Sequence, residues 1–357
     1  MLTKSFVEDL MYGRRQSPLF GAVLFALSLL YGALIRLRSL LFRMKLLRSN
    51  KLSCPVISIG NITLGGTGKT PAVIAVAEFL AKSGKHPVVV SRGYGRKDES
   101  QVEVVSDGRS LLVNAQTGGD EPVLLASRLP HVPVVVGSNR YQAAQHALQR
   151  FPVDVVILDD GFQHQRLRRA LDIVLVDATE PFGNGKLFPA GILREPVSAL
   201  GRAQAIIVTR TDKKESMAGL LESIRRTTQA EIFTSRHRPL DLVDCSTGER
   251  KPLTALRNVK AFVFSGIARP LSFTSLLTSL GVSIAAESVY PDHHHYQRSD
   301  LANIFKKAAD ARVNMIITTE KDMVRLKDLR PEGIWALCIE LDVIERNEWE
   351  QFLSRML

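Results

Sequence analysis

The chain has few cysteines and few aromatic residues for its length. Its 357 residues include three cysteines, Cys54, Cys245 and Cys338, which are far apart and form no CxxC pair. An odd number of distant thiols is untypical of a disulfide scaffold or a thiolate zinc site and is typical of a protein from a reducing compartment. Aromatic residues make up only 6% of the chain, which leaves little to stack nucleic-acid bases on. We therefore expect no nucleic-acid partner and no metal site built from thiols.

The N-terminal region is poor in acidic residues. From Arg14 to Arg48 the chain carries seven basic residues and no acidic one, and its formal net charge is +11 overall. The same region contains the longest uncharged apolar run, from Gln16 to Ile35, which as a helix would be about 30 Å long. The segment 36–48 then places leucines at helical spacing, with basic side chains along both edges of the stripe. This pattern is typical of a helix in an anionic membrane interface, and the net charge favours an acidic partner.

Three alternatives are open for this segment. It can be a helix buried against its own protein, a helix that spans the membrane, or a helix that lies in one leaflet. Pro18, Gly21 and Gly32 make it a mediocre span. A cleaved signal peptide fits poorly because the downstream flank is basic. We expect contact with a membrane and leave the choice between spanning and lying open.

After Ser49 the pattern changes to short apolar runs that alternate with helical stretches. Such β-branched runs bounded by helices are typical of parallel strands that are buried on both faces, so we predict an α/β fold. The runs that we expect to be strands are 55–60, 86–92, 132–137, 154–160, 172–178 and 203–210 in a first sheet, and 259–266, 282–289, 313–319 and 334–341 in a second, smaller unit.

A polar stretch from residue 230 to residue 256 divides the rest of the chain. We see no internal repeat and no low-complexity tract. We predict four segments: a membrane-associated helical segment at residues 1–50, a larger α/β domain at 51–229, an extended linker or hairpin at 230–257, and a smaller α/β domain at 258–357.

A glycine-rich turn follows the first expected strand. The sequence GNITLGGTGKTP begins at Gly60, so that a strand, glycines, a lysine, a threonine and a helix follow one another as in a P-loop. Backbone N–H groups of such a turn cradle phosphates, the lysine contacts the β- and γ-phosphates, and the hydroxyl contacts Mg²⁺. The P-loop motif has glycine where this chain has Thr63, and we expect the neighbouring glycines to supply the flexibility. The residues that we predict to bind nucleotide phosphates are Gly65, Gly66, Thr67, Gly68, Lys69 and Thr70.

Two adjacent carboxylates end another expected strand. The strand at 154–160 closes with Asp159 and Asp160, at the same sheet edge as the glycine loop if both strands are parallel. A P-loop needs a carboxylate at that edge to organise Mg²⁺. We therefore predict a P-loop NTPase-like domain in which Thr70 and this pair bind Mg²⁺, without dividing the roles between the two aspartates.

Two function classes fit these features. One is a membrane-associated regulatory P-loop ATPase, whose loop also reads GGTGKT. Such proteins carry a lysine just before the glycine pair, where this chain has Leu64. The other class is a kinase that acts on a substrate at the membrane surface. The basic run HQRLRRA at 164–170 is either a solvated face or a contact for lipid headgroups.

Six motifs in series resemble tetraacyldisaccharide 4′-kinase, the lipid A kinase of Gram-negative bacteria. They cover nearly the whole chain in order, and the departure at Thr63 is what the loop of that family has. The motifs are GNITLGGTGKTP, SRGYGR at 91–96, GGDEP at 118–122, LDDGFQH at 158–164, LFPAGILREP at 187–196 and PDHHHY at 291–296.

The resemblance implies an ATP-dependent lipid kinase. With Mg²⁺, it transfers the γ-phosphate of ATP to the 4′-hydroxyl of tetraacyldisaccharide 1-phosphate and so gives lipid IVA, in lipid A biosynthesis. The implied location is the cytosolic face of the bacterial inner membrane, and the lipid substrate explains both the apolar helix and the basic excess. We expect a monomer, and the acyl chains that it accepts are not predicted.

The acceptor of the hydroxyl proton must be a carboxylate or a histidine. The two glycines of TGGDEP allow Asp120 to come close to phosphates, and DHHHY is the other candidate segment. The resemblance assigns the base role to Asp120, assisted by His293, while Lys69 neutralises phosphate charge. Because the aspartate and the histidine fall in different predicted domains, we expect the site to form only when the two domains face each other.

Four further residues complete the predicted site. Arg92 and Arg96 of SRGYGR either form a surface turn or hold phosphates of the nucleotide or the lipid. Glu195 matches an acidic position of the family and is predicted to orient Mg²⁺ or Lys69. His294 is predicted to contact the substrate, and the three consecutive histidines, without HExxH spacing or a nearby cysteine, are not expected to form a metal cluster.

Overall fold

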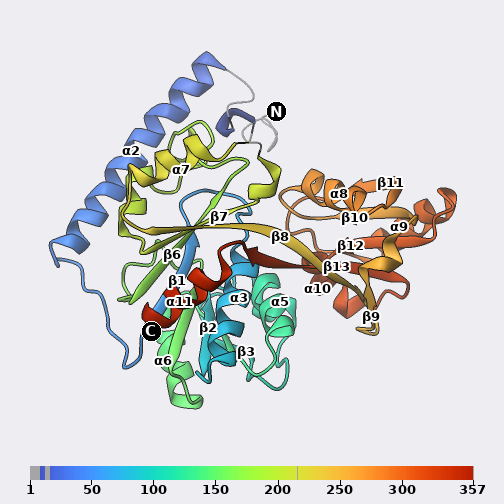
Figure 1. Ribbon diagram of the computed structural model, residues 1–357, viewed down its shortest axis with the longest axis horizontal. Coiled ribbons are helices and arrows are strands. Elements are labelled where there is room, and N and C mark those ends of the chain that lie inside the picture. Colours follow the sequence, from blue (N-terminus) through green and yellow to red (C-terminus); the bar gives the residue numbers. More distant parts are fainter. Residues whose placement is uncertain (1–8, 13–16, 215, 357) are drawn as a thin grey trace. The chain divides into compact units, whose positions relative to one another are not determined.

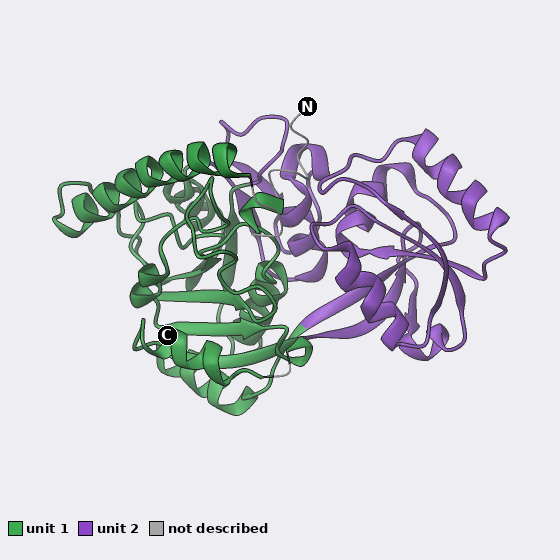
Figure 2. Ribbon diagram, turned by 90° about the horizontal axis from the view of Figure 1, so that it is seen from above, with its two compact units in different colours: residues 1–92, 139–236, 341–357 green, residues 93–138, 237–340 purple. Residues whose placement is uncertain are grey.

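The structure is a computed structural model that describes residues 9–12, 17–214 and 216–356. Its residues form two compact units, each assembled from separate segments of the chain (Figure 2). Unit 1 contains Met1–Arg92, Asn139–Arg236 and Leu341–Leu357, and unit 2 contains Gly93–Ser138 and His237–Glu340.

Unit 1 is built around a parallel sheet. Its strands are β1 (Val56–Asn61), β2 (Pro87–Ser91), β5 (Val155–Asp159), β6 (Leu171–Asp177), β7 (Ala205–Thr209) and β8 (Glu231–Asp244), of which β8 continues into unit 2. They lie in the order β8-β7-β6-β1-β5-β2, and each neighbouring pair is parallel. All strands of this sheet except β8 are buried along their whole length, as expected of apolar strands covered on both faces.

Helices cover both faces of this sheet (Figure 1). The helices of unit 1 are α2 (Pro18–Arg43), α3 (Lys69–Lys82), α6 (Arg140–Arg150), α7 (Ala218–Arg225) and α11 (Arg346–Met356), with short 3-10 helices at η1 (Val197–Arg202) and η2 (Thr211–Lys213). Helices α3 and α6 lie on one face of the sheet, and α7 lies on the other, on the side of α2.

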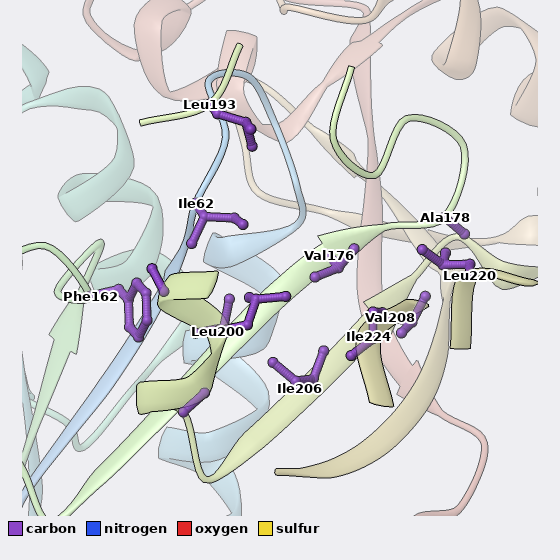
Figure 3. Packing of buried hydrophobic residues seen from close by; sticks show 13 residues of the cluster. Ile62, Phe162, Val176, Ala178, Leu193, Leu200, Ile206, Val208, Leu220 and Ile224 are labelled. Carbon is purple, nitrogen blue, oxygen red and sulfur yellow. The ribbon is translucent and has the colours of Figure 1, made fainter. Parts of the chain in front are cut away.

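A hydrophobic cluster of unit 1 anchors the segment that carries Glu195. Leu193, two residues earlier, is buried together with Ile62, Phe162 and Leu200 (Figure 3). Ile62 follows β1 and Phe162 follows β5, so apolar contacts hold together segments that leave the same edge of the sheet. Each such side chain stabilises the unit by about 1.5–3 kcal/mol relative to an exposed position.

Helix α2 contacts the rest of unit 1 with one face only. Its buried residues are Leu24, Ser28 and Gly32, which recur every four positions and so share a face. Gly32 comes so close to the segment before β7 that an added Cβ would lie 2.8 Å from Cδ1 of Leu187. Small residues at two of the three contact positions therefore let the helix backbone approach the protein.

The other faces of α2 form an exposed apolar surface. The helix is long and apolar enough to cross a membrane, and only 17% of its most apolar 18-residue stretch is buried. The alternative of a helix buried against its own protein is therefore wrong for the described residues. The start of the predicted segment, Arg14, Arg15 and Gln16, lies outside them.

Unit 2 contains a second parallel sheet and two antiparallel pairs. Strands β10 (Lys260–Ser265), β11 (Ser283–Val289), β12 (Met315–Thr319) and β13 (Ile334–Val343) lie in the order β11-β10-β12-β13 and pair in parallel, and the end of β13 belongs to unit 1. The antiparallel pairs are β3 (Glu103–Ser106) with β4 (Val134–Val136), and β8 with β9 (Arg250–Pro252). The helices are α4 (Ala115–Gly118), α5 (Asp120–Arg128), α8 (Pro270–Ser279), α9 (Arg298–Asp310) and α10 (Glu320–Leu326), with η3 (Leu253–Leu256) and η4 (Lys327–Leu329).

The predicted α/β class is confirmed, with a parallel sheet behind the glycine loop and a second α/β unit. Residues 230–257, predicted to form an extended linker or hairpin, contain β8 and β9, which pair antiparallel. The run at 132–137 forms β4, as expected, and one of its pairings was not predicted: β4 is antiparallel to β3, which is too short to be found from the sequence. The predicted domain limits at residues 50, 229 and 257 stay a prediction.

Candidate active site

The glycine loop connects β1 to α3. Gly65 and Gly68 have φ angles of 96° and 91°, in the left-handed region that side chains disfavour. Gly68 is the N-cap residue of α3, which begins at Lys69. The first turn of α3 therefore presents its N–H groups and the positive end of its dipole at the loop, the arrangement that binds phosphates. Nothing lies within 4 Å of the position that a Cβ of Gly66 would take, so the loop is open there.

Thr63 occupies the position where the P-loop motif has glycine. Its backbone forms an antiparallel bridge with Leu193, and the N–H of Leu64 donates to the carbonyl of Ile192 over 2.7 Å. The backbone at this position is therefore extended, a conformation that any residue adopts. The bridge explains why this loop does not need its first glycine.

Lys69 faces two polar side chains at the end of the sheet. Its Nζ is 3.4 Å from Oδ1 of Asn61 and 3.7 Å from Oδ1 of Asp160. The other oxygen of Asp160 lies 2.8 Å from Nη1 of Arg194. Burial acts to raise the pKa of Asp160, but Lys69 and Arg194 outweigh burial and hold the pKa of that carboxyl below its usual range. Asp160 is therefore ionised and bridges two cations beside the glycine loop.

Asp159 lies at the end of the strand next to β1. It is paired in register with Ile59, and its carboxylate accepts a hydrogen bond of 2.8 Å from Ser91 Oγ. Asp159 and Thr70 are both buried, and carboxylate and hydroxyl oxygens are ligands that suit Mg²⁺. Among the described residues, no group of three or more His, Cys, Asp or Glu side chains could hold a metal ion. The oxygens present therefore fit an ion that completes its coordination with phosphate and water.

Glu195 is held by neighbours of its own segment and of the β5 turn. Its carboxylate lies 2.8 Å from Nη1 of Arg202 and accepts a hydrogen bond of 3.0 Å from Nε2 of Gln163. Gln163 also donates to the carbonyl of Asn61 over 2.9 Å. Glu195 thus ties the loop before β7 to the end of β1, and its predicted metal role stays a prediction.

Arg210 contacts the glycine loop directly, although the sequence does not single it out. Its Nη1 donates to the carbonyl of Gly66 over 3.0 Å and forms an ion pair with Asp177 at the end of β6. The neighbouring Thr209 donates its hydroxyl to the carbonyl of Thr67 over 3.0 Å. These bonds turn two loop carbonyls toward the protein, which leaves the N–H groups for phosphates. A lone arginine after an apolar strand carries no motif, so only the fold reveals it.

Basic side chains also surround His164. Burial and the nearby Arg140 and Arg169 lower the pKa of His164 to about 4, so its imidazole is neutral at physiological pH. Its Nε2 has no hydrogen-bond partner among the described residues. The cluster is a positively charged region at the turn after β5, able to take an anionic group.

Asp120 and His293 are in contact within unit 2. Asp120 begins α5 after Gly119, and its Oδ2 lies 3.3 Å from Nδ1 of His293. The φ of His293 is 62°, a conformation that few residues other than glycine adopt and that is common at functional positions. The two residues do not belong to different domains, as the sequence suggested, because residues 93–138 group with residues 237–340. The expectation that the site forms when two domains face each other stays a prediction.

A third side chain, Arg325 of α10, contacts both Asp120 and His293. Its Nε donates to Oδ2 of Asp120 over 2.6 Å. Burial acts to raise the pKa of Asp120, but the bonds from His293 and Arg325 outweigh burial and hold the pKa of that carboxyl below its usual range. Asp120 is therefore ionised at neutral pH, as a proton acceptor must be. The exposed Tyr94 lies edge-on to His293, with ring centroids 6.3 Å apart.

The two predicted arginines of SRGYGR lie in different units and surroundings. Arg92 is exposed at the end of β2 in unit 1. Arg96 is buried in unit 2, and its Nη2 donates to the carbonyls of Glu99 and Gln101. Nε and Nη1 of Arg96 have no hydrogen-bond partner among the described residues. Contact of either arginine with phosphate stays a prediction.

His294 lies in an aromatic cluster next to the pair. Its Nε2 is 3.0 Å from Oδ2 of Asp300, and its ring stacks on Tyr290 with centroids 4.7 Å apart. Tyr296 packs edge-on against the same ring at 4.9 Å. These contacts give His294 a packing role, and its predicted contact with the substrate stays a prediction.

Comparison with known proteins points to one family over nearly the whole chain. The family model described as tetraacyldisaccharide-1-P 4′-kinase matches residues 20–357. The tetraacyldisaccharide 4′-kinase of Anaeromyxobacter sp. (strain Fw109-5) is 43% identical over 363 residues, which cover 99% of this chain and 96% of that protein. The protein of the same name from Syntrophus aciditrophicus (strain SB) is 41% identical over 361 residues, which cover 96% and 95%.

A solved structure agrees with these relatives. The crystal structure of LpxK from Aquifex aeolicus in complex with ATP matches with a TM-score of 0.78 at 30% sequence identity. The match covers 94% of this chain and 99% of that one. The similarity thus includes both compact units.

The geometry of the glycine loop predicts that Lys69→Met weakens ATP binding by about 10- to 100-fold, because a charge-assisted bond to phosphate contributes about 1.5–3 kcal/mol. Isothermal titration calorimetry with Mg²⁺ and a non-hydrolysable ATP analogue measures the change. Lys82→Met is the matched control, since Lys82 lies on the same helix and pairs with Glu78 in solvent. Equal affinities of the two variants would remove Lys69 from the phosphate site.

Proposed function

The chain belongs to the tetraacyldisaccharide-1-P 4′-kinase family, and on that premise we propose that it transfers the γ-phosphate of ATP to the 4′-hydroxyl of tetraacyldisaccharide 1-phosphate, giving lipid IVA. The observation that carries the proposal is the nucleotide loop of unit 1, beside which Lys69, Asp159 and Asp160 lie at one edge of a parallel sheet. Family membership favours this kinase over a membrane-associated regulatory ATPase.

The glycine loop and α3 bind the phosphates of ATP. The N–H groups from Gly65 to Thr70 surround the β-phosphate, and Lys69 neutralises charge on the β- and γ-phosphates. Arg210 and Thr209 support this role, since they hold two loop carbonyls away from the phosphates. Asp160 keeps Lys69 at the loop through their ion pair.

Thr70 and Asp159 would hold Mg²⁺. We assign the ion to Asp159 rather than Asp160 because Asp160 already bridges Lys69 and Arg194, and a third positive charge there would meet repulsion. When bound, the ion neutralises charge that develops on the β- and γ-phosphate oxygens.

Asp120 acts as the general base. It accepts the proton of the 4′-hydroxyl, whose oxygen forms a bond to the γ-phosphorus as the bond to the β–γ bridging oxygen breaks and ADP leaves. His293 orients the carboxylate through the contact at Oδ2. The depressed pKa of Asp120 supports this role, because the carboxylate is ionised throughout the physiological range.

The positively charged cluster around His164 receives the 1-phosphate of the lipid. Arg140 is buried beside the neutral His164, so that an anion there would meet positive charge of low solvent screening. The basic excess of the N-terminal region adds attraction to anionic lipids.

Helix α2 binds the membrane and lies in one leaflet. Four acyl chains cannot leave a bilayer easily, at about 0.8 kcal/mol per exposed CH₂, so the enzyme has to reach its substrate at the membrane. The hydroxyl of Tyr31, in the middle of α2, donates to the carbonyl of Arg194 over 2.9 Å. Because the middle of α2 is bonded to a polar loop of unit 1, hydrocarbon cannot surround the helix on all sides. This supports a helix that lies in one leaflet over a helix that spans the membrane. We place the protein at the cytosolic face of the inner membrane, where ATP is available, as a monomer.

If the proposed reaction is correct, the labelled γ-phosphate of ATP should be transferred to tetraacyldisaccharide 1-phosphate in detergent micelles. Lipid IVA, which already carries a 4′-phosphate, is the matched acceptor and takes no label. Thin-layer separation of the lipids measures both. Hydrolysis of ATP without any labelled lipid would contradict the kinase and favour a regulatory ATPase. Label on lipid IVA would show that a hydroxyl other than the 4′-hydroxyl accepts the phosphate.

Because Leu30 and Leu34 lie on the exposed face of α2, we expect Leu30→Ser combined with Leu34→Ser to weaken binding to phosphatidylglycerol vesicles by about 100-fold or more, since each leucine loses favourable burial of about 1.5–3 kcal/mol. Co-sedimentation with the vesicles measures the bound fraction. Leu271→Ser is the matched control, since Leu271 is an exposed leucine of unit 2, at 79%. The proposal fails if the double variant binds as the wild type does.

A further inference from the structure

Arg325 lies at the centre of a buried polar network in unit 2. Its side chain is 1% exposed, and its Nε donates to Oδ2 of Asp120 over 2.6 Å. Its Nη1 donates to the carbonyl of Gly266 over 2.7 Å and to Oδ1 of Asp322 over 3.1 Å. Its Nη2 lies 3.4 Å from Nδ1 of His293. One guanidinium thus contacts both members of the acid–base pair.

Asp322 fixes Arg325 from the other side. The Asp322 side chain is fully buried, and its Oδ1 accepts hydrogen bonds of 3.0 Å from the N–H of Gly266 and from the hydroxyl of Tyr296. Its other oxygen accepts a bond of 2.6 Å from the hydroxyl of Thr319. A buried network in which each polar group has a partner holds its members in one arrangement. The guanidinium therefore has a single position from which to meet Asp120.

Both side chains that contact Asp120 contact the same oxygen. Arg325 and His293 lie at Oδ2, and no side chain among the described residues bonds Oδ1. Two contacts on one oxygen fix the rotation of the carboxylate. Oδ1 is therefore the oxygen that is available to take a proton.

Two further ion pairs join α10 to α5 without touching Asp120. Nζ of Lys321 lies 2.5 Å from Oε1 of Glu121, and Nη1 of Arg128 lies 2.6 Å from Oε1 of Glu320. Both pairs are at least two-thirds buried. The packing of the two helices thus has ion pairs of its own, and Arg325 has a role that can be separated from it.

We propose that Arg325 is a positioning residue for phosphoryl transfer, which holds Oδ2 of Asp120 so that Oδ1 faces the acceptor hydroxyl. The inference rests on the proposed function, since it concerns the base of that reaction. Arg325 acts through Asp120: the proton of the hydroxyl goes to Oδ1 while the hydroxyl oxygen bonds the γ-phosphorus and ADP leaves. A base that is wrongly oriented loses much of its effect without any loss of substrate binding.

The charges that face Asp120 set the pH dependence. Arg325 on α10 and His293 before α9 contact the carboxylate of Asp120. Around them, Asp322 pairs with the same guanidinium, Asp292 lies 3.9 Å from His293, and Lys321 pairs with Glu121. Burial acts to raise the pKa of Asp120, but His293 and Arg325 outweigh burial and leave that pKa below its usual range. A base of this kind is active above its pKa and loses activity as the pH falls through it. Without the guanidinium the pKa rises, so the loss begins at a higher pH.

The test measures lipid phosphorylation against pH for the wild type, for Arg325→Lys, and for Arg325→Met combined with Asp322→Asn. The double variant removes one charge of each sign and so buries no additional unpaired charge. We expect its kcat to fall by about 10- to 100-fold, its KM for ATP to change by about twofold or less, and its acid limb to move to higher pH. Arg325→Lys should have a higher kcat than the double variant, and the acid limb of its pH profile should lie between those of the double variant and the wild type.

Arg128→Met combined with Glu320→Gln is the matched control, because it removes an ion pair between the same two helices. It should lower the unfolding temperature and leave the acid limb in place. A double variant at Arg325 with wild-type kcat and pH profile would overturn the inference, and so would an equal shift in the control. If circular dichroism shows the double variant unfolded, Arg325→Lys decides, and an unchanged acid limb there overturns the inference. Absence of transfer by the wild type would instead refute the proposed function.

Discussion

The parallel pairing of β1 with β5 is the constraint on which the nucleotide site depends. It places Ile59 opposite Asp159, so that the glycine loop and the two aspartates leave the sheet at one edge. The close approach needs a residue without a side chain at Gly60, since an added Cβ would lie 2.8 Å from Cβ of Phe162 and 2.9 Å from its backbone nitrogen. From this pairing follow the ion pair of Lys69 with the second aspartate and the position of the loop over the sheet.

Further bonds fix the loop at this edge, where we propose that the phosphates bind. The bridge between Thr63 and Leu193 adds backbone pairing just after β1. The side chain of Leu193 is also buried in the hydrophobic cluster of unit 1. Arg210 and Asp177 then hold the loop from the ends of the two strands on the other side of β1. The loop is thus fixed before a nucleotide arrives, which reduces the ordering that binding requires.

The proton chemistry that we propose for unit 2 depends on a different kind of interaction, buried ion pairs between two helices. Asp120 has two partners at one oxygen, His293 and Arg325, and Asp322 holds the second of them in place. Positions of phosphate-binding and base residues are thus set by separate structural means, a parallel sheet in unit 1 and a helix pair in unit 2. A substitution in one network should leave the other intact.

Local patterns account for what could be predicted from the sequence. Apolar runs predicted the strands, and the adjacency of glycines, Lys69 and Thr70 predicted the loop, because each signal lies within about ten residues of chain. Arg325 could not be found in this way, since its partners Asp120 and His293 are distant in the sequence and the segment TTEKDMVRL carries no general motif. The same holds for the bridge at Thr63 and for β3, whose pairing partners are set by the fold. The grouping of residues 93–138 with the C-terminal part of the chain is likewise a long-range property.

The most direct test compares ATP binding with phosphate transfer in Asp120→Asn. Calorimetry should find the affinity for Mg²⁺–ATP unchanged within about twofold, while single-turnover transfer to the lipid falls by about 10²- to 10⁴-fold, the usual contribution of a general base. A parallel loss of binding and transfer would contradict the separation of the two networks. Unchanged transfer would show that Asp120 is not the base.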